Sequence, residues 1–520
     1  MPIRIRPDKN RNSQQKVNRS SSSGRRSSGG GIGKIVVPLL VSLFKKNPKI
    51  GIALLIIGGA VYWYSSKNSG GSEAGGVTKI VQSLLSTGLN MDQKVYDKAE
   101  VFEALADNIK NPLPERVSLL KYAPSRKNQG QQGSCVGWAS GYAARTILFA
   151  KQSGQNPNKV RFSPSYVYNQ IALKNCQGAY MNNAMNLLLK KGALPYSEFA
   201  YTEHSCDQKP SSSQQNEARK FVTKGFNRLS KSDNNYKTDL LAIKQNLSQG
   251  APVVIGMMVG GTFMSKMNGR KIWKPTKADY NQNGFGGHAM CIIGYDDYLE
   301  GGAFQIMNSW GEKWGDDGIA WVKYNDFDFF TKEAYGLYPM GDANAVTSDQ
   351  LKGDLGIVLN ANGKNVALEQ RTDMSFTTTQ KLKTDTDFKI EVTNSIECYS
   401  YIFGEETNGS SYVLFPYTKK HSPYCGITGT RLFPRDHSLY ADDIGNKDKF
   451  AIIISKQKLD YNQLNKALTA SSGHTFEDKI KQVLKDELID DVKYKDGSTI
   501  HFEASTTHQT MLGVVIEVLK

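Results

Sequence analysis

Cysteine is scarce in this chain, with six in 520 residues. Small secreted domains that depend on disulfides are far richer in cysteine, so a disulfide-dense scaffold is excluded. A phosphate-binding loop is also missing, because Ile35 follows Gly33-Lys34 where the motif requires Ser or Thr. Three polar side chains of the C-terminal region lack the spacing of metal ligands: His421, His437 and Asp442. We therefore expect neither a cofactor nor a metal ion.

Acidic residues are nearly absent from the first 49 residues, which hold twelve Lys or Arg against the single carboxylate of Asp8. A segment this basic, with runs of Ser and Gly, cannot bury a core, so residues 1–49 are predicted to be a disordered tail. Subtracting its charge of +11 from the whole-chain +16 leaves +5 for residues 50–520. We expect no specific nucleic-acid partner. Polyanion binding by the tail would be salt-sensitive and would disappear with residues 1–49.

Charge is missing altogether from Ile50–Tyr64, a run of fifteen residues that follows three lysines and ends in Tyr-Trp-Tyr. The run is short for a spanning helix of about 17–25 residues, but Ser65 and Ser66 extend it into the headgroups. Cations on one side and aromatic residues on the other favour a membrane span. We predict a transmembrane anchor over residues 50–66. The alternatives are a cleaved signal-peptide core and a re-entrant or surface helix that also uses residues 35–44.

The positive-inside rule then orients the chain. The basic tail would stay in the cytoplasm, and the domains after the anchor would lie in the periplasm or outside the cell.

A candidate nucleophile, Cys135, follows Gly133-Ser134 and precedes a segment whose apolar residues recur at helical spacing. A thiol with a pKa near 8.5 becomes a thiolate at neutral pH only beside a positive group or a helix N-terminus. Cys135 would lie in the first helical turn, where the helix dipole stabilises negative charge.

A base and an orienting group lie further along the chain. His288 follows a glycine-rich stretch and precedes an apolar run that is predicted to be a buried strand. The side-chain oxygen of Asn308 can fix the imidazole tautomer, and Trp310 and Trp314 can shield that hydrogen bond from water.

These residues resemble those of the papain-like cysteine peptidases over about residues 111–340. Four blocks match the family in order: Leu113–Val117, Asn128–Cys135, Gly287–Ala289, and Asn308–Gly311 with Trp314–Gly318. The resemblance implies an α+β fold over residues 111–342, with a helical lobe and a β-barrel-like lobe. It also implies a catalytic set in which Gln129 donates to the oxyanion while Cys135, His288 and Asn308 act as nucleophile, base and orienting group.

The resemblance further implies a set of residues that contact an extended peptide substrate: Gln177, Gly178, Ala179, Gly287, Trp310 and Met340. Two positions depart from the family pattern, since Gln132 stands where a cysteine is usual and Val136 where a tryptophan is usual. One disulfide is therefore lost. Cys176 and Cys206 fall near family bridge positions without their usual partners, so they could bridge each other or stay reduced.

Residues 67–110 are predicted to be a linker followed by a short helical segment. One or two helices are expected over residues 77–111, with Val101, Phe102 and Leu105 on one face. The longer inhibitory propeptide of the family is not recognisable. This short segment could cover the cleft, but we expect it to pack beside the catalytic domain.

Residues 350–520 show alternating apolar and polar positions separated by Gly, Asn and Asp turns, which predicts a β-rich, sandwich-like domain. Helices are expected near residues 462–468 and 478–488. The stretch from Tyr399 to Ile454 resembles a bacterial domain of undefined function that is often joined to peptidases or kinases. We interpret it as a binding module for a protein partner.

Two functions fit these observations. The first is a membrane-anchored bacterial cysteine endopeptidase that cleaves peptide or protein substrates. The second is a catalytically silent papain-like scaffold in an envelope assembly. The complete catalytic set favours the first, while Val136, the missing propeptide and the large accessory domain favour the second.

Overall fold

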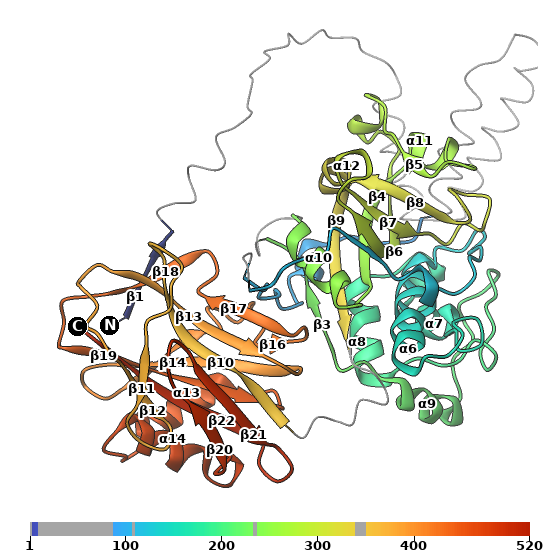
Figure 1. Ribbon diagram of the computed structural model, residues 1–520. Helices are drawn as coiled ribbons and strands as arrows, with labels where there is room; N and C mark the ends of the chain where they lie inside the picture. Colours follow the sequence, from blue (N-terminus) through green and yellow to red (C-terminus); the bar gives the residue numbers. More distant parts are fainter. Residues whose placement is uncertain (1–2, 9–86, 107–109, 232–236, 339–349) are drawn as a thin grey trace, which may run out of the picture. The chain divides into compact units, whose positions relative to one another are not determined.

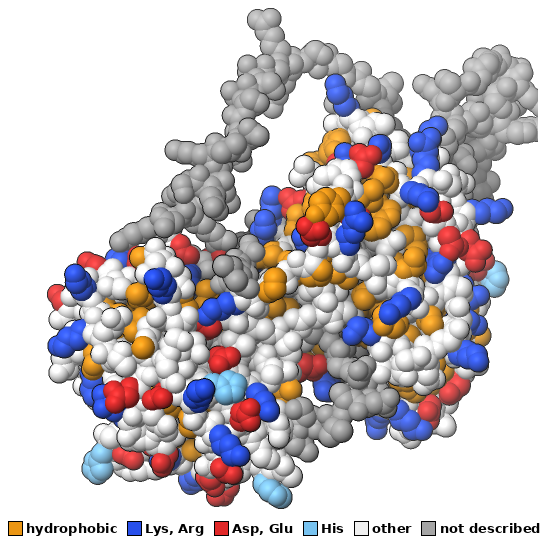
Figure 2. Space-filling model, viewed as in Figure 1, with side chains coloured by type: hydrophobic (Ala, Val, Ile, Leu, Met, Phe, Trp, Pro, Cys, Tyr) orange, Lys and Arg blue, Asp and Glu red, His pale blue; other side chains and the backbone are white. Residues whose placement is uncertain are grey.

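The computed structural model describes residues 3–8, 87–106, 110–231, 237–338 and 350–520. The predicted anchor, residues 50–66, lies outside these ranges. Among the described residues, no helix is long and apolar enough to cross a membrane. On the face shown in Figure 2, Lys and Arg side chains are interspersed with Asp and Glu. This mixture agrees with the small net charge left once the basic tail is set aside.

The catalytic region begins with a helical part, in which α6, α7, α8 and α9 lie together (Figure 1). The helices of this part are α5 (Cys135–Gly137), the π-helical segment η2 (Trp138–Arg145), α6 (Thr146–Ser153), α7 (Pro164–Ile171), α8 (Met181–Lys191) and α9 (Ser212–Ala218). Three further helices lie beside the sheet of the catalytic region: α10 (Leu240–Ser248), α11 (Gly261–Ser265) and α12 (Tyr324–Phe330). Segments α5, η2 and α6 run on without a break, so one helical stretch extends from Cys135 to Ser153. Glycine permits its close packing on α7, because a Cβ at Gly137 would lie 2.5 Å from the Pro164 carbonyl oxygen.

A sheet forms the second part of the catalytic region, in the strand order β3-β9-β4-β6-β7-β8-β5, with β2 paired to β6. The strands are β2 (Arg116–Ser118), β3 (Gly225–Arg228), β4 (Val253–Val259), β5 (Ile272–Trp273), β6 (Gly286–Asp296), β7 (Ala303–Met307), β8 (Ile319–Lys323) and β9 (Thr331–Tyr338). The apolar run after His288 forms the buried part of β6, as its composition predicts. Helical part and sheet share one hydrophobic core.

The C-terminal region is β-rich, as predicted, and contains two seven-stranded sheets. The first has the order β1-β18-β13-β10-β21-β20 with β17 on β13, and the second β11-β12-β22-β19-β14-β15 with β16 on β14. Apolar side chains from both sheets form one buried cluster. Helices α13 (Tyr461–Ala470) and α14 (Phe476–Leu484) pack on the other face of the second sheet, at the two places where the sequence predicts helices.

The strands of this region are β10 (Gln350–Leu359), β11 (Leu368–Gln370), β12 (Ser375–Thr378), β13 (Asp387–Asn394), β14 (Cys398–Glu405), β15 (Ser411–Phe415), β16 (Tyr424–Cys425), β17 (Gly429–Phe433), β18 (His437–Ala441), β19 (Lys447–Ser455), β20 (Val492–Lys495), β21 (Ile500–Ser505) and β22 (Met511–Leu519). Strands β20 and β21 alternate in burial along their length, whereas β13, β14, β19 and β22 contain runs of consecutive buried residues, since side chains on both of their faces are covered.

Residues 3–7 correct the prediction of a tail that is disordered throughout. They form β1 (Ile3–Pro7), which pairs antiparallel with β18. Isoleucine and arginine alternate here, which is the period of a strand. The Arg6 guanidinium is bonded to Asp387 at 2.6 Å, and Asp8 to Lys389 at 2.9 Å. These ion pairs give the basic segment a specific place on the sheet.

Residues 87–106 correct a second prediction. The only helix in this segment is α4 (Gln93–Tyr96), which Asp92 caps by accepting from the Lys94 N–H. The chain after Tyr96 is not helical, and Val101 forms backbone bridges. The apolar residues that suggested a helical face are buried instead against two different parts of the protein.

Candidate active site

Cys135 is the first residue of the long helical stretch, with Ser134 at the N-cap position. The Ser134 hydroxyl is hydrogen-bonded to the Tyr201 hydroxyl at 2.7 Å. The thiol is completely buried, and its sulfur accepts from the backbone N–H of Ala289, 3.4 Å away. Since Ala289 follows His288 on β6, this bond brings the candidate nucleophile and base to the same junction of helix and sheet.

The His288 ring has a fixed orientation. Its Nε2 lies 2.8 Å from the Asn308 side-chain oxygen, which can only accept, so the proton resides on Nε2. Trp310 stacks on the imidazole with ring centroids 4.4 Å apart. The remaining nitrogen, Nδ1, is buried and makes no hydrogen bond within the described part of the chain. Its lone pair is therefore available to take a proton.

Gln129 is held by several bonds. The Ser309 hydroxyl donates to its side-chain oxygen at 2.7 Å, and its own amide donates to the Gln132 carbonyl at 2.9 Å. The Tyr201 hydroxyl donates to its backbone carbonyl at 2.7 Å. The contacts of Ser309 and Tyr201 with Gln129 could not be predicted, because neither spacing nor composition distinguishes these two residues from other polar residues.

The cleft beside Cys135 is filled by the chain's own segment, residues 87–90. Two hydrogen bonds join it to Ala179: the Ala179 N–H donates to the Gly88 carbonyl at 2.9 Å, and the Asn90 N–H to the Ala179 carbonyl at 3.0 Å. Leu89 runs parallel to Ala179 and donates to the Gly287 carbonyl at 3.1 Å. The Asn90 side chain donates to the Gln177 carbonyl.

Backbone groups expected to hold substrate are thus occupied by this segment. The expectation that residues 67–110 pack beside the catalytic domain is wrong for residues 87–90.

Glycine allows the segment to pass directly over the nucleophile. A Cβ at Gly88 would lie 1.9 Å from the Gly133 carbonyl oxygen, and one at Gly178 would lie 2.2 Å from the Gly88 oxygen. The Gly88 backbone N–H also has a small lowering effect on the pKa of the Cys135 thiol. Any larger residue at position 88 would have to move away from the site.

The Leu89 side chain is 7 % exposed and belongs to the same buried apolar cluster as Cys135. A Cβ at Gly256 would meet the Leu89 side chain at 2.5 Å and that of Met181 at 3.1 Å. The Glu333 side chain lies against the same spot on Gly256. Burial raises the pKa of Glu333 to about 8, which favours its neutral form below that pH.

Burial also keeps the catalytic pair uncharged. It raises the pKa of the Cys135 thiol to about 11 and lowers the pKa of His288 to about 4, against the smaller raising effect of the Asn308 hydrogen bond. A thiolate and an imidazolium are therefore both disfavoured at neutral pH while the cleft is covered. Water must reach the pair before the charged, nucleophilic form is stable.

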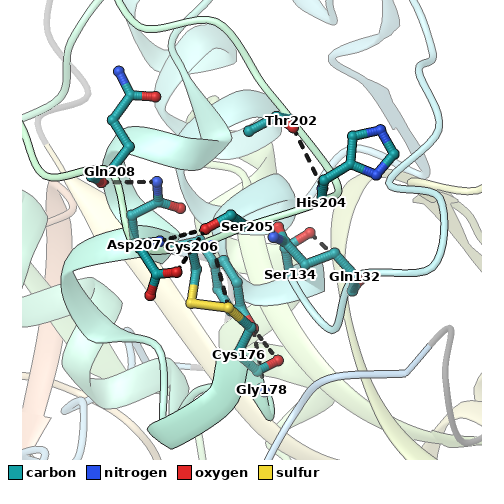
Figure 3. The surroundings of a disulfide bond; sticks show 12 residues. Gln132, Ser134, Cys176, Gly178, Thr202, His204, Ser205, Cys206, Asp207 and Gln208 are labelled. Atoms are coloured by element: carbon teal, nitrogen blue, oxygen red, sulfur yellow. Dashed lines mark hydrogen bonds between the residues drawn. A yellow bond between two sulfur atoms is a disulfide. The ribbon is translucent and has the colours of Figure 1, made fainter.

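A disulfide joins Cys176 to Cys206, with 5.8 Å between their Cα atoms (Figure 3). It lies next to the strip that contacts the segment, since Gly178 follows Cys176 by two residues. The Tyr168 hydroxyl donates to the Cys176 carbonyl at 2.7 Å and accepts from the Gly178 N–H at 3.2 Å. Disulfide and tyrosine together fix the backbone of residues 176–178.

The structure gives no information on one expected substrate contact, Met340, which lies outside the described residues. Within the described ranges, no group of three or more His, Cys, Asp or Glu side chains could hold a metal ion.

Comparison with known proteins gives a family match for part of the chain. Residues 115–337 match the family described as papain family cysteine protease. A peptidase C1-like protein of Acanthamoeba polyphaga mimivirus is 26% identical over 257 residues, which cover 46% of this chain and 81% of that protein. A cathepsin B-like protein of Giardia intestinalis is 28% identical over 206 residues, 38% of this chain and 62% of that protein.

Solved structures that resemble this one include xylellain, a cysteine protease from Xylella fastidiosa, with 21% identity and a TM-score of 0.41 over 49% of this chain and 97% of that chain. Digestive procathepsin L 3 of Tenebrio molitor has 17% identity and a TM-score of 0.39 over 60% of this chain and 95% of that chain.

The family match defines a class: residues 115–337 are a papain-family domain with a helical part, a sheet and a cysteine between them. These residues accordingly form a cysteine-type peptidase domain of the papain family, as the four sequence blocks imply. The match does not extend to the β-rich region or to the first 114 residues.

Proposed function

We propose that the protein is a cysteine endopeptidase in which Cys135 is the nucleophile and His288 the base. The observation that carries the proposal is the fixed imidazole: Nε2 is bound to Asn308, and Nδ1 has no partner among the described residues at the junction that also holds Cys135. Trp310 covers one face of the ring and limits its rotation.

In this mechanism His288 Nδ1 takes the Cys135 proton and the thiolate attacks the peptide carbonyl. The Gln129 amide and the Cys135 backbone N–H donate to the developing oxyanion, and one such donor contributes about 3 kcal/mol. The imidazolium then protonates the leaving amine. Water, deprotonated by the same histidine, hydrolyses the thioester and restores the thiol.

The form described here is latent. An extended peptide cannot use the backbone groups of Ala179 and Gly287 while residues 88–90 are bonded to them. The catalytic pair is also uncharged under this cover. Turnover therefore requires residues 87–90 to leave the cleft.

Opening the covered site distinguishes the active peptidase from the silent scaffold by experiment. Gly88→Val cannot keep the segment over Gly133, so it should open the cleft without touching a catalytic residue. The full-length wild type, Gly88→Val and Gly88→Val with Cys135→Ala are treated with a thiol-directed epoxide and with a peptide library, and both products are read by mass spectrometry.

We expect labelling of Cys135 and peptide cleavage in Gly88→Val, and neither when Cys135 is alanine. A folded Gly88→Val protein that is labelled but cleaves no peptide would support the silent scaffold instead, because access to the thiol would then not suffice for catalysis.

Membrane attachment through residues 50–66 also belongs to this proposal, on the sequence pattern alone. The side of the membrane on which each part of the chain lies depends on β1. A single crossing between residues 8 and 87 would place β1 and the β-rich domain on opposite sides of the membrane, where β1 could not pair with β18. Pairing favours attachment by a re-entrant or surface helix that uses residues 35–44 as well.

A further inference from the structure

The segment that fills the cleft continues into an extended stretch, residues 100–106, that two domains bind. Its backbone bonds alternate between the catalytic and β-rich domains. On the catalytic side, Arg228 donates to the Glu100 carbonyl at 3.0 Å and accepts from the Phe102 N–H at 2.9 Å. On the other side, the Val101 N–H donates to the Lys420 carbonyl at 2.6 Å, and the Ser422 N–H donates to the Val101 carbonyl at 2.9 Å.

Ala106 and Asn111 form three hydrogen bonds with β17 of the β-rich domain. The Ala106 N–H donates to the Thr430 carbonyl at 2.8 Å. The Asn111 side chain donates to the same carbonyl at 3.0 Å and accepts from the Thr430 N–H at 2.9 Å. These bonds place an amide side chain where a neighbouring strand would lie, so β17 binds this part of the chain as it would bind a strand.

A buried arginine reinforces this contact. Arg431 is 1 % exposed and donates from Nε to the Glu103 carbonyl at 3.0 Å. Its other nitrogens are bonded to Asn394 and to the Ile427 carbonyl within the β-rich domain. A charged donor to a buried carbonyl is among the stronger hydrogen bonds in a protein. Removing either domain from the segment would leave buried polar groups without partners.

An ion pair adds a partly exposed contact. Lys458, just after β19, lies 2.6 Å from the Glu100 carboxylate, with side chains 54 % and 32 % exposed. Lys466 on α13 is an exposed lysine of the same domain that makes no ion pair with the described residues of the segment.

We propose that the β-rich C-terminal domain is a clamp that keeps residues 87–90 in the cleft. The inference rests on the proposed function and adds its regulation. The domain holds residues 100–106, and only the short stretch of residues 91–99 separates Asn90 in the cleft from Glu100 in the clamp. A short tether of this kind keeps the local concentration of the cleft-filling residues high. Loss of the clamp leaves the segment bound only to the catalytic domain, through Tyr96, Asp97 and the Arg228 backbone. The weaker hold on residues 87–90 then exposes Cys135 more often.

The test compares access to Cys135 in full-length variants that weaken the clamp on one side only. Val101→Pro removes the N–H that donates to Lys420 and leaves both bonds to Arg228, and its ring is compatible with an extended preceding residue. Lys458→Glu replaces an attraction to Glu100 by a repulsion. Lys466→Glu is the matched control, with the same charge change on an exposed lysine of the same domain.

The readout is the rate at which iodoacetamide, a small neutral reagent, alkylates Cys135, measured by peptide mass spectrometry. One lost hydrogen bond corresponds to about a fivefold change in an equilibrium, and a partly exposed ion pair to about threefold. We expect increases of this size for Val101→Pro and Lys458→Glu, no change for Lys466→Glu, and restoration when Glu100→Lys is added to Lys458→Glu.

The proposal of a clamp is contradicted if Val101→Pro and Lys458→Glu are alkylated at the wild-type rate while Gly88→Val is alkylated faster. Alkylation needs no peptide cleavage, so this outcome is distinct from failure of the proposed function, in which Gly88→Val is alkylated but inactive. Thermal melting of each variant identifies general unfolding, and the charge-swapped pair keeps the proposal testable if Val101→Pro does not fold.

Discussion

Ser309 determines how Gln129 presents its amide to the site. Its hydroxyl donates to the Gln129 side-chain oxygen, so the amide nitrogen is the end left for donation. The motif around residues 128–135 predicts an oxyanion role for Gln129 and a nucleophile role for Cys135. It could not predict Ser309 as a positioning residue, because 180 residues separate the two partners of this bond and only the fold brings them together.

Replacing Gln129 should therefore affect catalysis more than stability. In the open Gly88→Val background, Gln129→Ala should lower kcat by about a hundredfold or more, the usual effect of losing one oxyanion donor. Ser309→Ala keeps the donor but frees its orientation, so a smaller decrease is expected. Steady-state kinetics on one peptide and thermal melting measure both effects. Equal losses in the two variants would contradict a direct oxyanion role for Gln129.

The pH dependence of alkylation at Cys135 reports whether the cleft is covered. In the wild type, burial raises the pKa of the thiol to about 11, so the reactive thiolate should accumulate only as the pH approaches that value. In Gly88→Val, water and a protonated His288 can stabilise the thiolate, so the rate should already be high near neutral pH. Iodoacetamide rates from about pH 5 to about pH 10 measure this. Identical profiles would show that residues 87–90 do not control the pair.

At the scale of elements, residues 87–106 show why a helical pattern can mislead. Val101, Phe102 and Leu105 are all buried, as a helical face would predict. They are buried in an extended chain, because the backbone finds its hydrogen-bond partners in the two flanking domains rather than in its own next turn. Hydrogen bonds to distant segments of the chain cannot be predicted from the local spacing of apolar residues. By contrast, the buried strand β6 and both C-terminal helices were predictable, since their own composition determines them.

Glu103 should make the stability of the extended stretch, residues 100–106, depend on pH. Its carboxyl is 4 % exposed, and burial raises its pKa to about 8, against lowering contributions from Arg435, the Tyr417 hydroxyl and Arg431; Asp436 raises it further. The neutral form is thus the one that the clamp accommodates. Its stabilising contribution is complete below the ordinary glutamate pKa of about 4.3 and is lost as the pH rises through about 8.

Glu103→Gln should remove this dependence, because the amide is neutral at every pH. We expect the thermal midpoint of the wild type to fall relative to that of the variant between about pH 5 and about pH 9. Lys466→Glu, a surface change away from the segment, should follow the wild type. Parallel curves for wild type and Glu103→Gln would mean that Glu103 is not the group that titrates in the clamp.

At the scale of the whole molecule, the position of the first strand limits how the chain can meet a membrane. Antiparallel pairing places Arg4 opposite Tyr440, and Arg6 contacts both Asp385 and Asp387. The sequence predicted a cytoplasmic tail and an exported body, from charge counts near residues 50–66. Charge counts do not take into account the pairing of β1 with β18. The charge pattern and the strand pairing therefore disagree on where the N-terminus lies.

Cross-linking in cells decides whether β1 is paired with β18 or lies on the other side of the membrane. Arg4→Cys combined with Tyr440→Cys places two thiols at paired positions of β1 and β18, so a mild oxidant should join them in a large share of molecules. Arg4→Cys with Lys466→Cys, on α13, is the control and should stay reduced. A cross-link confined to the first pair means that β1 and β18 lie in the same compartment. This result excludes a single crossing between residues 8 and 87. If neither pair is joined while the N-terminus is protected from added protease and the C-terminal domain is cut, a single-pass anchor is retained and β1 is unpaired in the membrane-bound protein.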